Sequence, residues 1–241
     1  MRIQKYLAQL GMASRREAEQ WIIDGEVTLN GEIAEIGATL DPEKDRLMVR
    51  GRTVKSVTPT KITLLMNKPK GVLCSNEDPH HESTVFDLLP PRFSKTKLFC
   101  AGRLDKDSEG MLILTNDGDL SQAMTHPAQE IPKYYRVKLN RELDPAIIPK
   151  LIEGREVEGE YLKFEKVITP PTRSADGGSY KVVLYHGRKR EIRRLFQSFG
   201  YFVKKLQRFQ IGNLPLKGLA RGQCRKLTES EIRRLLDQAE K

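Results

Sequence analysis

The first fifty residues show a helical pattern of apolar residues followed by short strand-like runs. Four apolar side chains repeat at the spacing of one helix face and predict a helix over residues 2–10: Ile3, Tyr6, Leu7 and Leu10. The segment Ser14-Arg15-Arg16-Glu17 matches a capping box, so we expect a second helix to start there and to end at Gly25. Strands are predicted at 27–29 and 32–34, because Asn30-Gly31 between them is typical of a tight hairpin turn.

From residue 61 onwards, strand and helix patterns follow one another without strict alternation. Apolar runs predict strands at 61–66, 72–74, 134–139 and 180–185, and two more around a polar loop within 98–118, the second of them at 111–114. Helices are predicted at 85–89, 119–125, 143–152, 190–199 and, after a capping box at Thr228, at 229–239. This order is typical of an α+β domain with a mixed, mostly antiparallel sheet and flanking helices.

Residues 51–60 have little patterning and separate these two parts, so they predict a linker. We therefore expect a small helix–helix–hairpin domain at 1–50 and a larger sheet domain at 61–241.

Charge changes the picture, because it is concentrated. The 241 residues carry a net charge of +10, and residues 181–226 contain 13 Lys/Arg against one acidic residue, Glu191. A smaller basic cluster lies near the start: Arg2, Lys5, Arg15 and Arg16. Two basic regions in one chain favour nucleic acid as the partner over an anionic membrane surface, although a solvated face without any partner is the plainer alternative.

Several classes of function are unexpected. No apolar run exceeds four residues, so we expect neither a transmembrane helix nor a secretory signal. The three cysteines are widely spaced, which is typical of a reduced, cytoplasmic protein without disulfides. Metal-ligand spacings and nucleotide-binding loops are missing from the sequence, so no metal and no cofactor are expected.

The polar loop 102–110 is the candidate for chemistry. It holds Asp105, Asp107 and Glu109 between two apolar strands, and a carboxylate fixed by rigid strands can act as nucleophile or general base. From the residues alone an ordinary polar turn is the simpler interpretation, and the spacing does not choose among the three carboxylates.

Five segments in order along the chain resemble the RsuA/RluB/RluE/RluF family of ribosomal RNA pseudouridine synthases. The opening residues 2–31 are similar to the S4 RNA-binding domain of that family. The other four segments resemble its catalytic motifs: Asn67–Val72, Gly102–Asp105 with Glu109–Gly118, Lys133–Val137, and Gly187–Arg194. The resemblance therefore implies an S4-like domain joined to a pseudouridine synthase domain.

The family isomerises a chosen uridine, a reaction that requires no cofactor or metal. The catalytic aspartate of its GRLD motif falls on Asp105. The resemblance places on Arg193 a cation that would keep this carboxylate ionised and orient it. It places on Tyr135 a side chain that would lie against the uracil and relay a proton, with Tyr134 left open as the alternative.

The resemblance also implies which residues hold RNA. Lys5, Arg15 and Arg16 would contact the RNA backbone from the first domain, although Arg15 and Arg16 are also the first residues of a helix. The basic stretch adds four more candidates: Arg188, Lys189, Arg190 and Arg194. Arg103 either enters the gap left by a flipped-out base or forms an ion pair with Asp107 or Glu109.

We therefore expect a cytoplasmic, monomeric pseudouridine synthase, with ribosomal RNA or an assembling ribosomal particle as its partner and the large subunit favoured over the small. The alternative is a ribosome-assembly factor that binds RNA on the same fold without catalysis.

Overall fold

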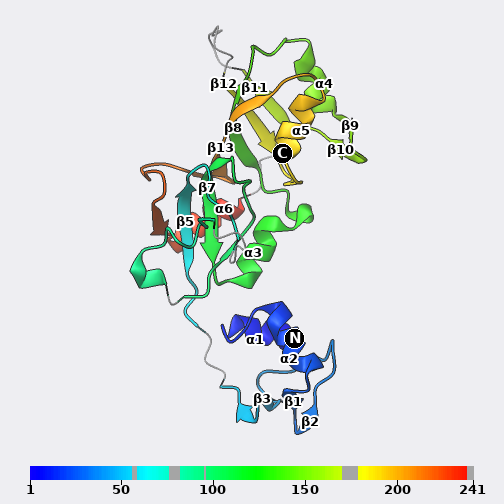
Figure 1. The fold of residues 1–241 in the computed structure, drawn as a ribbon, viewed down its shortest axis with the longest axis vertical. Helices are drawn as coiled ribbons and strands as arrows, with labels where there is room; N and C mark the ends of the chain where they lie inside the picture. Colours follow the sequence, from blue (N-terminus) through cyan, green and yellow to red (C-terminus); the bar gives the residue numbers. More distant parts are fainter. Residues whose placement is uncertain (56–58, 76–81, 95, 170–178, 238–241) are drawn as a thin grey trace. The chain divides into compact units, whose positions relative to one another are not determined.

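The computed structural model describes residues 1–55, 59–75, 82–94, 96–169 and 179–237. Internal contacts divide the chain into two units, residues 1–61 with 116–118, and residues 62–115 with 119–241 (Figure 1). The predicted linker 51–60 includes residues 56–58, which lie outside the described residues.

The first unit begins with two short helices, α1 (Ile3–Gln9) and α2 (Arg15–Ile23). The capping box predicted at the start of α2 is confirmed, because the Ser14 hydroxyl accepts from the Glu17 N–H and the Glu17 carboxylate accepts from the Ser14 N–H, each at 3.1 Å. The helices pack on a core formed with the strands: Ile3, Leu7, Ala18, Ile22, Val27 and Leu47 are among its buried residues.

The sheet of this unit has four strands in the order β2-β1-β3-β4. The Asn30-Gly31 turn joins β1 (Val27–Leu29) to β2 (Glu32–Ile33), and both turn residues have the positive φ that such a hairpin requires. β3 (Leu47–Val49) and β4 (Arg52–Thr53) complete it. β4 lies within the segment predicted as linker, so the sheet extends past Arg50.

The second unit is built on a nine-stranded sheet, whose main path runs β11-β12-β8-β13-β7-β5-β15, with β14 on β13 and β6 on β7. All of its pairings are antiparallel except β13 with β7. This confirms the α+β fold with a mostly antiparallel sheet. The strands are β5 (Thr63–Lys68), β6 (Phe99–Cys100), β7 (Glu109–Thr115), β8 (Lys133–Leu139), β11 (Lys166–Ile168), β12 (Ser179–Leu184), β13 (Val203–Ile211), β14 (Leu214–Pro215) and β15 (Cys224–Lys226).

Helices cover each half of this sheet (Figure 1). Leu151 of α4 (Ile147–Glu153) and Phe196 of α5 (Glu191–Gln197) pack on β8 and β12, next to the separate hairpin of β9 (Arg155–Val157) and β10 (Glu160–Leu162). On the other half, Leu120 of α3 (Gly118–Thr125) and Leu235 of α6 (Glu229–Leu236) pack on β5 and β7. Two 3-10 turns, η1 (Pro91–Phe93) and η2 (Pro127–Gln129), complete the elements.

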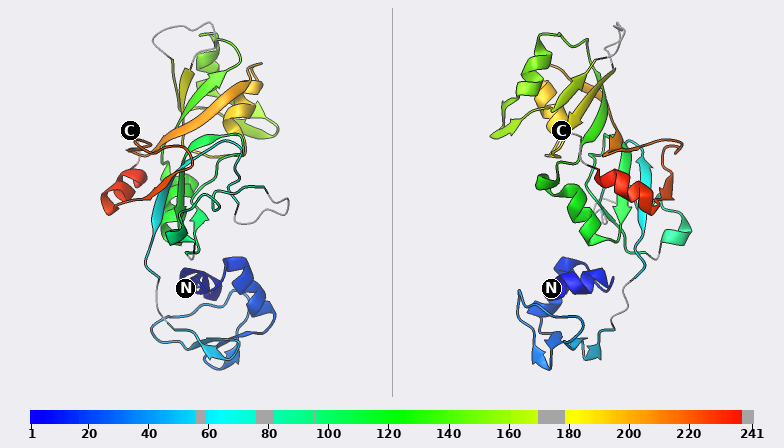
Figure 2. Two further views of the ribbon diagram at one scale, coloured as in Figure 1. Left: turned by 60° about the vertical axis from the view of Figure 1, so that its left-hand side comes forward. Right: turned by 180° about the vertical axis from the view of Figure 1, so that it is seen from behind.

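Strand β13 joins the two halves of the sheet, as Figure 2 shows in orange. The sequence did not predict it, because VKKLQRFQI lacks regular alternation and the strand has register shifts near both ends. The parallel pairing with β7 requires Gly110, whose φ is +105° and where a Cβ atom would come within 2.2 Å of the Arg208 carbonyl oxygen. The two halves therefore approach closely at the second residue of β7.

Two predicted elements are wrong. Residues 85–89 form a turn instead of a helix, and 72–74 contribute only one isolated bridge, between Leu73 and Thr84. In addition, β5 runs on through Asn67 and Lys68, past the end of the strand predicted at 61–66. The extension carries Lys68 into the interior, below the loop between β6 and β7.

Candidate active site

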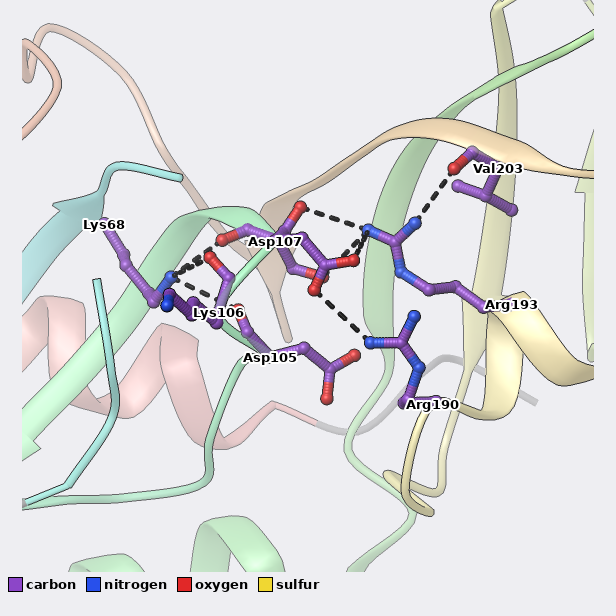
Figure 3. Close-up of polar contacts among 8 residues, drawn as sticks. Lys68, Asp105, Lys106, Asp107, Arg190, Arg193 and Val203 are labelled. Carbon is purple, nitrogen blue, oxygen red and sulfur yellow. Dashed lines mark hydrogen bonds and ion pairs between the residues drawn. The ribbon is translucent and has the colours of Figure 1, made fainter. Parts of the chain in front are cut away.

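The loop 101–108 links β6 to β7 and is held from below by one buried ammonium. The Lys68 Nζ lies within hydrogen-bond distance of four carbonyl oxygens, those of Ser108 at 2.8 Å, Pro69 at 3.1 Å, Asp105 at 3.2 Å and Lys106 at 3.3 Å (Figure 3). The Gly71 N–H also donates to the Lys106 carbonyl at 2.8 Å. The Asn67–Val72 and Gly102–Asp105 segments, distant in sequence, thus meet in one structure.

Lys68 is completely buried, with 0% of its surface exposed. Burial lowers the pKa of its ammonium, and nearby acidic groups that include Asp105 and Asp107 oppose this effect. Because its ammonium donates hydrogen bonds to the loop carbonyls, the side chain acts as a charged clamp on the backbone of the loop.

Asp105 is held by its backbone and free at its side chain. Its carbonyl accepts from the Lys68 Nζ and from the Ser108 N–H, the latter at 3.0 Å. Within the described part of the chain its carboxylate has no hydrogen bond or ion pair, and the side chain is half-buried on the side of the loop toward Arg190 (Figure 3). A fixed backbone with an unengaged carboxylate leaves both oxygens available to a ligand.

Arg193 reaches the same loop but bonds to a different aspartate than predicted. From α5, its guanidinium contacts the Asp107 carboxylate at 3.6 Å and donates to the Asp107 carbonyl at 3.1 Å and the Val203 carbonyl at 2.9 Å. Burial lowers the pKa of Arg193, while the charges of Asp107 and Asp105 raise it. The predicted direct bond to Asp105 is therefore corrected: Arg193 feels the charge of Asp105 but holds Asp107.

Arg190 supports this arrangement from the residue before α5. It adopts a left-handed conformation, with φ of +52°, and its Nη1 lies 3.3 Å from the Asp107 Oδ1. Burial acts to raise the pKa of Asp107, but the charges of Arg193 and Arg190 outweigh it and the pKa falls below its usual value. Asp107 is thus an ionised bridge between the loop and α5.

Tyr135 and Tyr134 point to opposite faces of β8. Tyr135 is buried in the same core cluster as Leu104, the residue before Asp105, and its hydroxyl accepts from the Arg208 Nη1 at 3.4 Å. Tyr134 lies on the other face, with its ring 6.2 Å from that of Phe209. Tyr135 is therefore the tyrosine on the side of the sheet that carries Leu104.

The other basic residues of the C-terminal stretch divide into two groups. Lys189 and Arg188 are exposed, and the Arg188 guanidinium donates to the Tyr161 carbonyl. Arg194 turns away from the loop, where it binds the carboxylates of Glu158 and Glu160 and the Val157 carbonyl. These contacts fasten α5 to the β9–β10 hairpin.

Arg103 is exposed and has no ion pair among the described residues. The alternative in which it pairs with Asp107 or Glu109 is not what the structure contains. Asp107 binds Arg190 and Arg193, and Glu109 binds Lys205 at 3.0 Å and Arg221 at 3.5 Å.

In the first unit, Arg15 and Arg16 are exposed at the start of α2, and Lys5 is half-buried on α1. Neither arginine has a carboxylate partner in the part of the chain that the structure describes. Positive charge at a helix N-terminus is unfavourable by itself, so an anion bound there would relieve it.

A pocket of about 290 Å³ opens beside Asp107 and Glu109. Four cationic side chains line it: Lys70, Lys204, Lys205 and Arg221. Asp105 is not part of its lining.

Sequence reasoning missed Lys68 and Arg208. Lys68 lies in a motif that carries the resemblance. The mostly apolar residues 62–66 come just before it, and a strand that continued past them would have indicated that Lys68 points inward. No pattern singles out Arg208 from the basic stretch, yet only 3% of its surface is exposed.

Among the described residues no cluster of three or more His, Cys, Asp or Glu could hold a metal ion. The helices within the same residues are all too short or too polar to cross a membrane.

Fold and site together define a two-part protein. The S4 domain model matches residues 1–46, and the model described as RNA pseudouridylate synthase matches residues 62–198. The chain therefore belongs to the RNA pseudouridylate synthase family and carries an S4 domain.

Relatives agree with this assignment. The chain is 34% identical over 235 residues to "Ribosomal large subunit pseudouridine synthase B" of Pseudomonas aeruginosa, with 96% of this chain and 60% of that protein covered. It is 35% identical to an "Uncharacterized RNA pseudouridine synthase" of Aquifex aeolicus, with 98% and 96% covered. A solved structure described as "Crystal structure of pseudouridylate synthase" matches with a TM-score of 0.69 at 29% identity, covering 98% of this chain and 99% of that one. The chain thus spans nearly the whole length of the Aquifex protein but about 60% of the Pseudomonas protein.

Proposed function

We propose that this protein is a pseudouridine synthase that isomerises one uridine of ribosomal RNA, with Asp105 as its catalytic carboxylate. The observation that carries the proposal is the Asp105 loop, whose backbone is clamped by Lys68 while its carboxylate has no partner among the described residues. Relatives in Pseudomonas aeruginosa and Haemophilus influenzae bear the name of large-subunit enzymes, at 34% and 36% identity, which favours the large subunit as the source of the substrate.

The reaction needs only the groups that the site supplies. The N1–C1′ bond of uridine breaks, the uracil turns, and a C5–C1′ bond forms, so the product has the same atoms and the same oxidation state. Asp105 would act on the uridine as nucleophile or base. Lys68, Arg193 and Arg190 hold its loop through backbone carbonyls and the Asp107 carboxylate, which would fix the position from which Asp105 acts.

The remaining sequence-predicted residues would bind and position the RNA. A paired base must leave the stack before its glycosidic carbon can be reached, which costs a few kcal/mol. Arg103, exposed and without an ion pair in the described chain, would enter the gap that the base leaves. Phosphate contacts from Arg188, Lys189 and Arg190, and from Lys5, Arg15 and Arg16 in the S4 domain, would offset this cost. We assign Arg194 a role in the fold, because its bonds go to Glu158 and Glu160.

The proposal also covers the form of the RNA substrate, the oligomeric state and the cellular compartment. Ribosomal RNA, free or in an assembling particle, would be bound by a monomer in the cytoplasm, with the two units on the same RNA.

Tritium release from large-subunit ribosomal RNA labelled at uridine C5 tests the proposal. Wild type should release tritium, and Asp105→Asn should release it on the order of 10³-fold more slowly while RNA affinity stays within about twofold. Asp107→Asn is the matched control on the same loop, and it should retain more activity than Asp105→Asn. Equal release by wild type and Asp105→Asn would remove Asp105 from catalysis. No release by wild type from either ribosomal RNA would favour a non-catalytic assembly factor.

A further inference from the structure

Arg208 is a buried cation without a carboxylate partner among the residues that the structure describes. It lies in the middle of β13, with 3% of its surface exposed. Its Nε donates to the Met111 carbonyl at 2.8 Å and its Nη1 donates to the Tyr135 hydroxyl at 3.4 Å. Its Nη2 is buried without a hydrogen-bond partner in the described part of the chain.

This arrangement is costly for a folded protein. A buried charge needs a counterion or full hydrogen bonding to offset its lost hydration, and the described residues supply Arg208 with neither. Its charge also acts on its surroundings, since after burial it is one of the causes that lower the pKa of Lys133 and of Lys68. An apolar residue of the same length would fill this place in the sheet without these costs.

The neighbour that sets the surroundings of Arg208 apart is the hydroxyl of Tyr135. A phenol hydroxyl has one proton to donate and lone pairs with which to accept. With Arg208 donating to the oxygen, the hydroxyl proton is left for an acceptor elsewhere. The ring lies in the core cluster that includes Leu104, one residue before Asp105.

We propose that Arg208 is a positioning residue that acts through Tyr135 and stabilises its oxygen during proton relay, a role that rests on the function proposed above. In the isomerisation C5 of the uracil loses one proton and N1 gains one. Tyr135 can give its own proton to N1 and then take the proton from C5, so that it ends unchanged. Between these transfers its oxygen is a phenolate, which a hydrogen bond from a guanidinium stabilises.

A double-variant cycle tests this role: wild type, Arg208→Met, Tyr135→Phe and the double variant. Turnover of C5-tritiated large-subunit ribosomal RNA should fall on the order of 10²-fold in each single variant, with KM changed by less than about twofold. The double variant should be no slower than Tyr135→Phe, because Arg208 has nothing left to act on. The melting temperature of Arg208→Met should not fall below that of wild type, since its unpaired buried charge is gone.

A purely structural Arg208 predicts the opposite pattern. Its loss would lower the melting temperature and leave turnover of the folded protein intact, or its effect would multiply with that of Tyr135→Phe, and either result overturns the proposal. Arg136→Met, on the exposed face of β8, is the matched control and should turn over RNA like wild type.

Two further outcomes are also decisive. If Arg208→Met fails to fold, Arg208→Lys replaces it. One ammonium cannot serve both the Met111 carbonyl and the Tyr135 hydroxyl in the same geometry, so this variant should lose at least about tenfold in turnover; wild-type turnover would contradict the role. If wild type releases no tritium, both the proposed function and this role are refuted. If wild type is active and Arg208→Met turns over RNA at the same rate, only the role of Arg208 is refuted.

Discussion

The two units use basic residues in opposite ways. In the S4 domain, Arg15 and Arg16 are exposed to solvent at the start of α2 and have no carboxylate partner among the described residues. In the synthase domain, Lys68 and Arg208 are buried and donate to backbone carbonyls, Lys68 to that of Ser108 and Arg208 to that of Met111. Identical charges thus have different surroundings: an exposed cation is accessible to a binding partner, whereas a buried one contacts only the protein itself.

Solvent makes the energetic difference. Exposed charges are screened by salt over about 8–10 Å, so their contribution to RNA binding should fall as salt rises. A buried ammonium or guanidinium is screened far less and acts on fixed neighbours. Variants of buried cations should therefore change turnover or stability, and variants of exposed cations should change affinity.

Among the variants of basic residues compared here, Arg193→Ala should give the largest effect. It removes the guanidinium that holds Asp107 and the Val203 carbonyl, so the Asp105 loop loses this link to α5 and keeps the one that Arg190 makes to Asp107. We expect turnover to fall on the order of 10²-fold or more, while RNA affinity changes by less than about threefold. Single-turnover tritium release and a filter-binding titration measure the two quantities separately.

Arg155→Ala is the control for this variant, because Arg155 donates to the Ser198 carbonyl at the far end of α5. A large loss of affinity in Arg193→Ala, with turnover of bound RNA intact, would place Arg193 among the RNA-binding cations instead.

Lys68→Met should come next, with an effect on stability as well as turnover. Unlike Arg208, Lys68 has carbonyl acceptors for all its protons, so its removal strips a donor from several loop carbonyls. A buried carbonyl without a donor costs about 1–3 kcal/mol. We expect the melting temperature to drop by at least about 4 °C and turnover to fall by about tenfold or more.

Lys70→Met, two residues along, removes an exposed ammonium and should leave the melting temperature within about 1 °C of wild type. Equal melting temperatures for Lys68→Met and wild type would mean that the loop does not depend on the clamp.

Sequence patterns predicted what is local and missed what is tertiary. The starts of α2 and α6 were predictable because a capping box lies within four residues, and the Asn30-Gly31 hairpin because its turn needs only those two residues. β13 was not predictable, since a central strand between two halves of a sheet need not alternate between apolar and polar residues.

The site follows the same division. The loop with Asp105 was found through motifs. The resemblance named Tyr135 and left Tyr134 open, and in the structure these two side chains point to opposite faces of β8. The partners of Arg193 were not predictable, because Asp107 and Asp105 differ by two positions and only the folded loop decides which one meets α5. Burial of Lys68 and Arg208 depends on neighbours more than 30 residues away.

Lys133 offers a smaller, pH-dependent effect. Its Nζ donates to the Tyr185 carbonyl at 2.7 Å, and burial lowers its pKa to about 8, from 10.5 for the free side chain. Between these values the unfolded chain holds a proton that the folded protein has released, so stability rises with pH across that window. The contribution is at most about 3 kcal/mol.

Urea unfolding between pH 7.5 and 10.5 measures this contribution, and the slope with pH should be smaller in Lys133→Met than in wild type. An exposed lysine gives no such slope, so Lys138→Met should behave like wild type. Identical slopes for wild type and Lys133→Met would show that Lys133 titrates alike in the folded and unfolded states.

Arg15→Ala/Arg16→Ala should have the smallest effect on the chemistry. This double variant is also the most direct test of the contrast between the two units. Each arginine that contacts a phosphate should contribute about 0.7–0.9 to the slope of log affinity against log salt. The double variant should therefore bind RNA more weakly at low salt and flatten that slope by between about 1 and 2, with turnover at saturating RNA unchanged.

Lys44→Ala/Arg52→Ala removes the same charge from exposed positions elsewhere in the first unit. If both double variants lost affinity equally, the domain would attract RNA by its net charge alone. A loss confined to Arg15→Ala/Arg16→Ala means that phosphates sit at the start of α2, where two cations face a helix N-terminus and an anion relieves both. Reduced turnover at saturating RNA would instead mean that exposed cations of the first unit reach the chemistry of the second, and the division between binding and positioning would fail.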